Sequence, residues 1–532
     1  MNDRFRWLCG IFILQSAVAF STLSHTNRAN VRRRVGKLSS TEVEEVVVAD
    51  PTTMNTGSTD GAREIFSEDL SLSSMVGVID DDRIVFPELS TGEVSRMFSS
   101  LEYTRDDEGN LSVRHASGST IGAAALVAGT TIGAGVLALP AATVGTGFLT
   151  SSIAMVVAWF FMASSGLLVA ELSLNRFGET GRPGLGILDL YENSLGKAWG
   201  LVGSAAYFFL HYAMLVAYIA QGGANLDGLL NSIGLDVLSG IPGMGQLLFV
   251  GTGATALYFA RASLVENVNN LLVLGVFASF LGILGLGVGS ADFGALLNPA
   301  NQHPVQILGT FPIIILALVY QNVVPTVVTQ LEGDRQKITT AILAGTTLPF
   351  LMFEAWNAVI LGNVLSFGAP SSLETIDPVA VLKEGSDGQL LSSLVGCFSE
   401  LALVTSLVGF VFGLLDALTD VASLPTEGPA YEKLKPMLFA GVFLPPLALA
   451  VSSPDIFYQA LDYGGSFGVS TLFLLLPPIM VWKQRYSDDQ ALLTTKPMVP
   501  LGKITLGSMG TAAAAMIAQQ AFEKFSPILT NL

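Results

Sequence analysis

The residues best suited to binding chemistry lie between positions 129 and 140, which read GTTIGAGVLALP. Glycine costs a helix roughly 1 kcal/mol relative to alanine, and Gly133 and Gly135 stand one residue apart in this segment. This spacing favours an unwound backbone with free amide groups. The half-helix after such a break presents the positive end of its dipole, so the segment can bind an anion.

A second interruption lies between residues 311 and 330. Tyr320, Gln321 and Asn322 interrupt the apolar run there, and Pro325 follows them. Proline has no amide N–H, so it should free a carbonyl group one turn earlier, near Gln321. The segment therefore predicts a second break that offers backbone oxygen atoms to other partners.

Composition indicates what kind of element must hold these two segments. Of 532 residues, 51% are hydrophobic and 13% are charged, whereas about a quarter are charged in soluble domains. No Asp, Glu, Lys or Arg occurs from His115 to Ala170 or between Asp292 and Glu332. A bilayer span needs roughly 20 apolar residues. The sequence therefore predicts an all-α polytopic membrane protein with the lipid bilayer as its surroundings.

Several other classes of protein are excluded. The net charge of −17 would repel nucleic acid. Two cysteines, Cys9 and Cys397, cannot form a disulfide framework or a thiolate metal site. The four histidines lack the spacing of a metal motif. We expect no metal, no other cofactor and no enzymatic activity.

Loop charge supports a division into about eleven transmembrane helices. Twelve basic residues of the region after residue 117 fall in loops on one side and two on the other. The positive-inside rule then places the amino terminus on the basic side. The predicted spans are 119–140, 148–174, 198–225, 244–260, 267–290, 307–330, 339–362, 391–416, 436–452, 463–482 and 504–522.

The two interruptions fall in the first and sixth spans. That spacing is typical of an inverted repeat of five plus five helices, with a ligand near the midplane between the broken segments. Close helix packing is the alternative for Gly129 and Gly133, which have small-residue spacing. Gly135 lies off that stripe, and irregular backbone in a membrane is tolerated where it lines a polar cavity. We therefore favour a broken binding helix.

The first-span segment GTTIGAGVLALP resembles the signature of the hydroxy/aromatic amino acid permeases. These are the tryptophan/tyrosine-specific transporters of bacteria and plant plastids, within the amino acid–polyamine–organocation superfamily. Three further stretches are similar to the family pattern and occur in the same order: AELSLN at 170–175, LP to EAW at 348–356, and VTS to LD at 404–416. The resemblance covers most of 118–525.

The resemblance implies a role for each matched position. Backbone amides of the first break would bind the carboxylate of an amino acid, and carbonyl groups of the second would hold its ammonium group. Thr405 and Ser406 occupy the place of sodium ligands in sodium-coupled members of this fold, whereas aromatic permeases are taken to be proton-driven. The substrate-binding positions implied are Gly129, Thr130, Thr131, Ile132, Gly133, Ala134, Gly135, Tyr320, Gln321 and Asn322.

A stripe of polar and aromatic residues follows one face of the third span. It comprises Tyr207, His211, Met214, Tyr218, Gln221 and Asn225. Polar faces in membrane helices point into the bundle, so we expect Tyr207, His211 and Tyr218 to line the substrate site. Core packing is the alternative for each of them. His211 could relay a proton or make a structural hydrogen bond.

Two carboxylates lie inside the spans. Glu354 lies deep in the seventh span and is the better candidate for proton coupling. Glu171 ends the second span close to Asn175 and Arg176, which could satisfy it near the membrane surface. A structural role is therefore preferred for Glu171.

The first 117 residues have a different composition from the rest. Residues 1–40 combine a short signal peptide with an Arg- and Ser-rich stretch that lacks acids, a two-part presequence that indicates a plastid. Residues 41–117 are acidic and poor in apolar periods, which predicts a disordered segment. Residues 118–532 would then form the transporter domain. The family resemblance suggests the plastid inner envelope membrane.

The sequence therefore predicts secondary active transport of an amino acid, tyrosine or tryptophan, by proton symport through alternating access. The alternatives are a sodium-coupled carrier or one that accepts a broader range of neutral amino acids. A channel would need rings of like residues or a repeated filter loop. An intramembrane aspartyl protease would need YD and GxGD motifs, and neither occurs.

Overall fold

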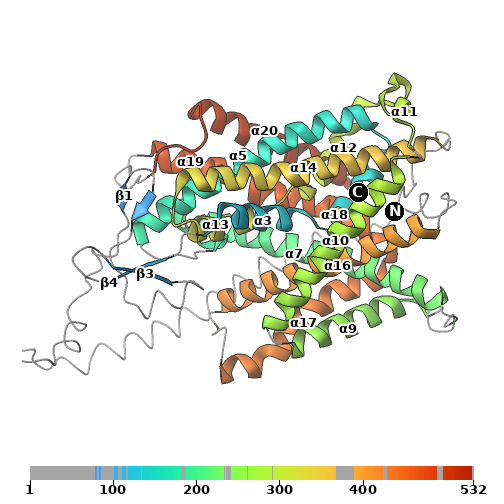
Figure 1. Ribbon diagram of the computed structural model, residues 1–532, viewed down its shortest axis with the longest axis horizontal. Coiled ribbons are helices and arrows are strands. Elements are labelled where there is room, and N and C mark those ends of the chain that lie inside the picture. The colour runs from blue at the N-terminus through green and yellow to red at the C-terminus, as the bar shows by residue number, and fades with distance from the viewer. Residues whose placement is uncertain are drawn as a thin grey trace, which may run out of the picture.

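Uncharged stretches of the sequence form long helices that pack side by side (Figure 1). The computed structural model describes residues 78–80, 83–85, 101–105, 111–115, 118–133, 135–180, 186–232, 234, 241–260, 262–289, 291–366, 389–422, 424, 428–487 and 495–529. The presequence predicted for residues 1–40 lies outside the described residues.

Each predicted span coincides with one helix or with a pair of helices that continue one another. The continuous helices are α5 (Phe148–Thr180), α7 (Lys197–Ser232), α9 (Met244–Phe259), α10 (Ala262–Gly287), α14 (Arg335–Ser366), α16 (Gln389–Ala422), α17 (Pro429–Ser452) and α20 (Lys503–Leu529). The interrupted ones are α3 (Thr120–Thr131) with α4 (Gly135–Thr143), α12 (Ile307–Ala317) with α13 (Val324–Gln330), and α18 (Phe457–Tyr463) with α19 (Leu476–Tyr486).

The all-α polytopic membrane fold is confirmed. Among the described residues, seven helical segments are long and apolar enough to cross a membrane, or eight if α3 and α4 form one span. Helix α9 and the Leu271–Gly287 part of α10 are shorter apolar helices. The count of eleven spans and the inverted repeat therefore stay predictions.

Both predicted breaks are present. The axes of α3 and α4 meet at 55° where residues 132–134 interrupt them. Helix α12 ends at Ala317, and the 3-10 turn η4 (Gln321–Val323) precedes α13. Pro325, predicted to free a carbonyl group near Gln321, lies in the first turn of α13, where a missing amide costs no hydrogen bond. The helix ends earlier, so the carbonyl groups released differ from the one predicted near Gln321.

The span predicted at 463–482 contains a feature that hydropathy did not indicate. Between α18 and α19 the chain forms a twelve-residue π-helix, η6 (Gly464–Leu475). Long π-helical runs are rare. This one is almost wholly buried and packs against α7, α12 and α20. One of its carbonyl groups also accepts a hydrogen bond from a neighbouring helix, because the Ser165 hydroxyl of α5 donates to Phe473 O.

The short connecting elements hold the ends of the bundle together. Helix α6 packs beside α7, and its Tyr191 hydroxyl donates to Leu472 O at 3.0 Å; burial raises the pKa of this phenol well above its usual value. At the other end, Lys524 of α20 pairs with Asp462 of α18. The short helices are α6 (Ile187–Leu195), α11 (Phe293–Leu297), η2 (Pro299–Asn301), η3 (Pro304–Gln306) and η5 (Pro454–Ile456).

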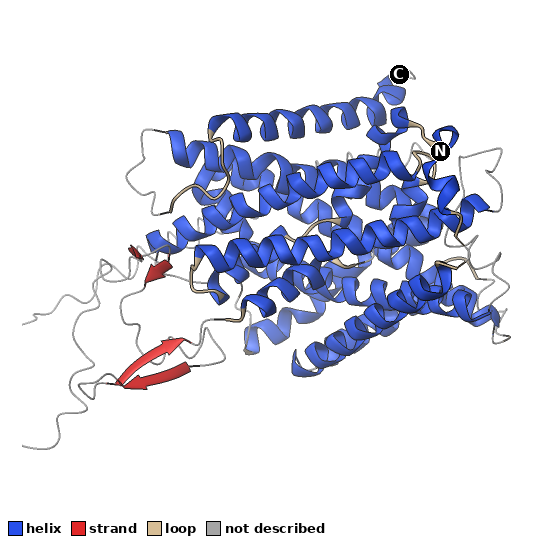
Figure 2. Cartoon of the chain, turned by 45° about the horizontal axis from the view of Figure 1, so that its top comes forward, coloured by secondary structure: helices blue, strands red, loops and turns tan. Residues whose placement is uncertain are grey.

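Strands occur only ahead of the helices in the described part of the chain. Two antiparallel hairpins pair β1 (Val78–Asp80) with β2 (Arg83–Val85), and β3 (Leu101–Arg105) with β4 (Leu111–His115). The β3–β4 hairpin lies apart from the helical bundle, whereas β1 and β2 lie close to its end (Figure 2). The disorder expected for residues 41–117 as a whole stays a prediction.

Candidate functional site

The break between α3 and α4 leaves two amide groups free. Ile132 N still donates to Ala128 O at 2.9 Å, and the backbone then turns extended, with φ −78° and ψ 95° at Ile132. Val136 N donates to Gly133 O at 3.2 Å, which restarts the helix. Within the described residues, the amides of Gly133 and Gly135 make no backbone hydrogen bond. Both therefore remain available to an anion.

The same glycines bring the break against two other helices. A Cβ atom on Gly133 would lie 2.7 Å from Oγ of Ser406 in α16. A Cβ atom on Gly135 would lie 3.0 Å from Cα of Ala317, the last residue of α12. Gly129 differs, since nothing lies within 4 Å of its Cβ position. The glycines therefore serve close contact as well as the unwinding.

The break after α12 leaves carbonyl groups free. Leu318 N and Val319 N donate back to Ile315 O and Leu316 O at 3.1 and 3.4 Å. The oxygen atoms of Ala317, Leu318 and Val319 accept no backbone hydrogen bond from another described residue. Because Gly135 rests on Ala317, free amides and free carbonyls lie at the point where the two broken helices meet.

Two of the three side chains of the second break are buried and share one partner, and the third is exposed. The Tyr320 hydroxyl and Gln321 Nε2 both donate to Met162 O of α5, at 3.0 and 3.2 Å. Tyr320 and Gln321 are completely buried. Asn322 is exposed.

Ser406 and Tyr218 connect α16 and α7 beside the first break. The Tyr218 hydroxyl donates to Met214 Sδ at 3.8 Å and also interacts with the Ser406 side chain, and Ser406 touches Gly133. The neighbouring Thr405 instead donates to carbonyl groups of its own helix, at 2.9 Å to Leu401 O and 3.1 Å to Ala402 O. Of the two predicted sodium ligands, only Ser406 is thus placed against the break.

An aromatic row runs between α7 and α16. Tyr207 stacks on His211 with ring centroids 3.9 Å apart, and Phe410 lies 5.0 Å from His211 and 5.6 Å from Tyr218. The sequence analysis missed Phe410. The signal available was its place one helical turn after Ser406, on the same face of α16.

His211 has a structural partner within its own helix, because its Nδ1 lies 2.8 Å from Tyr207 O. The other members of the predicted stripe make their contacts outside the aromatic row. Met214 lies against Gly464 of the π-helix, and Gln221 donates to Asn225 at 3.0 Å. The structure therefore places three members of the stripe in the aromatic row, Tyr207, His211 and Tyr218.

Glu354 belongs to a polar group between α14 and α5, separate from the two breaks. The Ser152 hydroxyl donates to Glu354 Oε2 at 2.7 Å, while Oε1 is buried and has no hydrogen-bond partner. One turn away, Asn357 accepts from Thr143 at 2.7 Å and donates to Ser151 at 3.3 Å. This group links the end of α4 to α5 and α14.

Exposure differs between the two halves of the broken helices. Val136–Pro140 of α4 are all buried, and so are Pro312–Ala317 of α12. On the halves nearer the basic side, Ile121 of α3 is 81% exposed, and Asn322 and Thr326 are also exposed. Exposed residues therefore occur on the halves nearer the basic loops, α3 and α13, beside buried ones such as Val127 and Val328.

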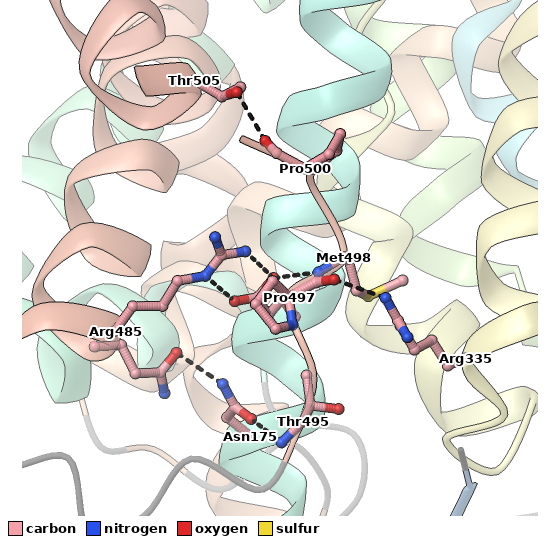
Figure 3. Close-up of polar contacts among 10 residues, drawn as sticks. Asn175, Arg335, Arg485, Thr495, Pro497, Met498, Pro500 and Thr505 are labelled. Carbon is pink, nitrogen blue, oxygen red and sulfur yellow. Dashed lines mark hydrogen bonds and ion pairs between the residues drawn. The ribbon is translucent and has the colours of Figure 1, made fainter. Parts of the chain in front are cut away.

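Residues 495–500, a short strap ahead of α20, connect helix ends on the side of the basic loops. Met498 N donates to Glu171 Oε2 at 2.8 Å, and Thr495 N donates to Asn175 Oδ1 at 3.1 Å. Arg335 at the start of α14 donates to Pro497 O at 2.6 Å (Figure 3). The strap thus joins the ends of α5 and α14.

Arg485 is the true partner of Glu171 and replaces the neighbour suggested by sequence. Its guanidinium donates to both carboxylate oxygens, at 2.6 and 2.5 Å. Arg176 instead pairs with Glu179 and Asp189. The structural role of Glu171 stays a prediction, which this pair supports, but the partner expected was wrong, because the real one lies 314 positions away.

The long apolar helices identify an integral membrane protein, and two broken helices that meet inside such a bundle are typical of secondary transporters. No group of three or more His, Cys, Asp or Glu side chains in the described ranges could hold a metal ion. A sequence model of the tryptophan/tyrosine permease family matches residues 116–507. The chain therefore belongs to the tryptophan/tyrosine permease family, which confirms the resemblance found in the first span.

Proteins named as amino acid transporters are similar to this chain over most of their own length. The tyrosine-specific transport system 1 of Haemophilus influenzae is 28% identical over 375 residues, covering 69% of this chain and 88% of that protein. The tryptophan-specific transport protein of the same organism is 27% identical over 383 residues, covering 70% and 88%. The glutamine transporter 2 of Aliivibrio fischeri is 22% identical over 370 residues, covering 69% and 90%.

Proposed function

We propose that this protein carries an aromatic amino acid, tyrosine or tryptophan, across a membrane by proton symport through alternating access. One observation carries the proposal: the free amides at Gly133 and Gly135 lie where the free carbonyl of Ala317 begins the second break. An amino acid is a zwitterion with a carboxylate and an ammonium group on one carbon. The free amides of the first break can pair with the carboxylate, and the free carbonyl groups of the second break can pair with the ammonium group.

The physical argument concerns desolvation. A charged group brought into a membrane without partners costs several kcal/mol, so both ends of a zwitterion must be paired at once. Amides at a half-helix start suit the carboxylate, and unwound carbonyl groups suit the ammonium group. Ile132 begins the first break, whereas Thr130 and Thr131 end α3, and their hydroxyl groups donate to Leu126 O and Val127 O of the same helix at 2.8 Å. Ala134 lies outside the described residues.

The aromatic row supports an aromatic side chain on the substrate. Tyr218 and Phe410 lie beside Ser406, which touches Gly133 of the first break. Aromatic rings pair edge to face at centroid distances of 4.5–7 Å, so this wall suits tyrosine or tryptophan. Relatives named for tyrosine and for tryptophan favour the same substrates. A relative named for glutamine keeps broader neutral specificity as the second candidate.

Glu354 is the proposed proton carrier. Its Oε1 atom is buried and has no hydrogen-bond partner among the described residues, and ionisable side chains inside a membrane mark proton pathways. Thr405 donates its proton to Leu401 O of its own helix, which leaves its oxygen lone pairs able to accept a cation, but of the two predicted ligands only Ser406 lies against the first break. This arrangement supports proton coupling over sodium coupling. The plastid inner envelope and a solvated segment at 41–117 complete the proposal on the sequence grounds given above.

Purified protein in proteoliposomes tests the proposal. Labelled tyrosine and tryptophan should accumulate under an inward proton gradient, saturate with concentration and exchange with unlabelled substrate inside. A sodium gradient alone should have no effect. A channel would neither saturate nor show exchange.

Competition tests the zwitterion site directly. Tyramine, which keeps the aromatic ring but lacks the carboxylate, should compete at least tenfold more weakly than tyrosine. Equal competition by tyramine would contradict carboxylate binding at the first break. Equal uptake of glutamine and tyrosine would favour the broader carrier.

A further inference from the structure

The carbonyl oxygen of Met162 in α5 accepts two side-chain hydrogen bonds from the second break. Tyr320 Oη donates at 3.0 Å and Gln321 Nε2 at 3.2 Å. Gln321 Nε2 also lies 3.6 Å from Met162 Sδ. Two consecutive residues of the unwound chain are therefore fixed to one point on a neighbouring, continuous helix.

Gln321 uses both ends of its amide in this arrangement. Its Oε1 accepts from Tyr320 N at 3.0 Å, while its Nε2 reaches Met162. The backbone amide of Tyr320 would otherwise be a buried donor without a partner, which costs about 1–3 kcal/mol. The side chain thus caps the break and anchors it.

Gly166 explains how Tyr320 reaches the α5 backbone. A Cβ atom at position 166 would lie only 1.9 Å from the Tyr320 hydroxyl. Any larger residue would force the phenol away from Met162 O. Both Tyr320 and Gln321 have zero exposed surface, and their polar atoms are already used. Neither side chain is free to pair with a substrate.

We infer that Tyr320 and Gln321 are positioning residues, which hold the second break open while backbone carbonyls and Asn322 meet the substrate. This inference rests on the proposed function for the carbonyl groups of Ala317, Leu318 and Val319. Asn322 is the exposed side chain of the three predicted residues. Tyr320 and Gln321 are buried, and they act on the substrate by fixing the conformation of the backbone.

A positioning role predicts a specific pattern of transport defects. Tyr320→Phe and Gln321→Leu should each weaken the affinity for tyrosine roughly five- to tenfold, the effect of about one hydrogen bond. The affinity for tryptophan should fall by the same factor, because neither side chain touches the ring. The double variant should lose less than the product of the single losses, since both bonds fix the same segment.

Matched controls remove equivalent bonds elsewhere. Tyr212→Phe deletes a phenol that donates to Gly441 O at 2.8 Å, and Gln520→Leu deletes an amide that donates to Leu308 O at 3.0 Å. Both should transport like the parent protein. Losses as large as those at 320 and 321 would mean that any buried hydrogen bond matters equally, which would overturn the inference.

A second readout does not depend on the substrate. In a background with Cys9→Ser and Cys397→Ser, Asn322→Cys reports the shape of the break through its rate of labelling by a membrane-impermeant thiol reagent. Gln321→Leu should change that rate at least threefold and Tyr212→Phe should not. If transport of aromatic amino acids fails while this shift is observed, the proposed function is wrong and the positioning role stands.

Two outcomes would overturn the positioning role. One is a changed ratio of tyrosine to tryptophan affinity in Tyr320→Phe or Gln321→Leu, which would indicate direct contact with the substrate. The other is parental affinity together with parental labelling in both variants, which would show that the bonds to Met162 do not hold the break.

Discussion

Arg485 and Glu171 form a two-bond ion pair that is buried between α19 and α5. Their side chains are 6% and 1% exposed, and Glu171 also accepts the amide of Met498 at 2.8 Å. A buried pair contributes little over an apolar pair of the same size, but removing one partner leaves an uncompensated charge. The pair therefore fixes which segments meet on the basic side.

Glu171→Gln should destabilise the protein by about 3–5 kcal/mol, because it leaves the Arg485 guanidinium buried without its counter-charge. The loss can be measured as a lower melting temperature of the purified protein in detergent. The double change Glu171→Met with Arg485→Met should recover most of it. Lys337→Ala is the control, since Lys337 is 40% exposed and 3.9 Å from Asp334; such surface pairs contribute about 0–1 kcal/mol. An unstable double variant would show that the charges themselves stabilise the fold.

Gly133→Ala should abolish most uptake. Its new methyl group would lie 2.7 Å from Ser406 Oγ and would cover the amides of the first break. Adding Ser406→Ala separates two causes, because the next Ser406 atom, Cβ, lies 3.9 Å away, an ordinary contact. We expect uptake to stay at least tenfold below the parent in this double variant, measured with labelled tyrosine at matched expression.

Recovery of uptake in that double variant would indicate that Gly133 serves helix packing alone. Gly396→Ala in α16 is the control, because nothing lies within 4 Å of its Cβ position. It should insert and transport like the parent protein.

Glu354→Gln should separate exchange from accumulation. Glutamine keeps the shape and the bond to Ser152 but cannot release a proton, so exchange of labelled for unlabelled tyrosine should persist. Accumulation driven by an inward proton gradient should fall at least tenfold. Glu523→Gln, a change at the exposed end of α20, serves as the control. Accumulation in Glu354→Gln equal to that of the parent would assign proton coupling to another group.

The sequence was sufficient for the helices and for the first break. Uncharged stretches of about 20 residues have few alternatives to a membrane helix, and Gly133 and Gly135 stand too close together for packing alone. It is less accurate for the second break, where Pro325 is predicted to free a carbonyl group near Gln321. The proline sits in the first turn of α13, and the chain unwinds several residues earlier.

Contacts between distant positions could not be predicted. Arg485 reaches Glu171 across 314 positions, and Tyr320 reaches Met162 across 158. Local composition gives no sign of either contact, because each depends on how helices pack. The π-helix was hidden for a similar reason: Gly464–Leu475 has the hydropathy of an ordinary span, and its hydrogen-bond pattern follows from packing against α7 and α20.

Removal of residues 1–116 should leave insertion, stability and transport unchanged in a reconstituted system. Among the described residues, the amide of Gly118, just ahead of α3, donates to Gln330 O at 2.8 Å. A chain that starts at Ser117 keeps that contact, which ties the start of α3 to the end of α13. Melting temperature and tyrosine uptake of the shortened protein are the measurements.

Gly118→Ala in the same shortened protein tests whether that contact is the boundary. Its Cβ atom would lie 2.4 Å from Gln330 O, so α3 and α13 would have to separate at the basic side. We expect a lower melting temperature and slower uptake, because both half-helices flank the proposed site. A shortened protein that fails to fold before this change is made would show that the acidic segment is part of the transporter domain rather than a solvated linker.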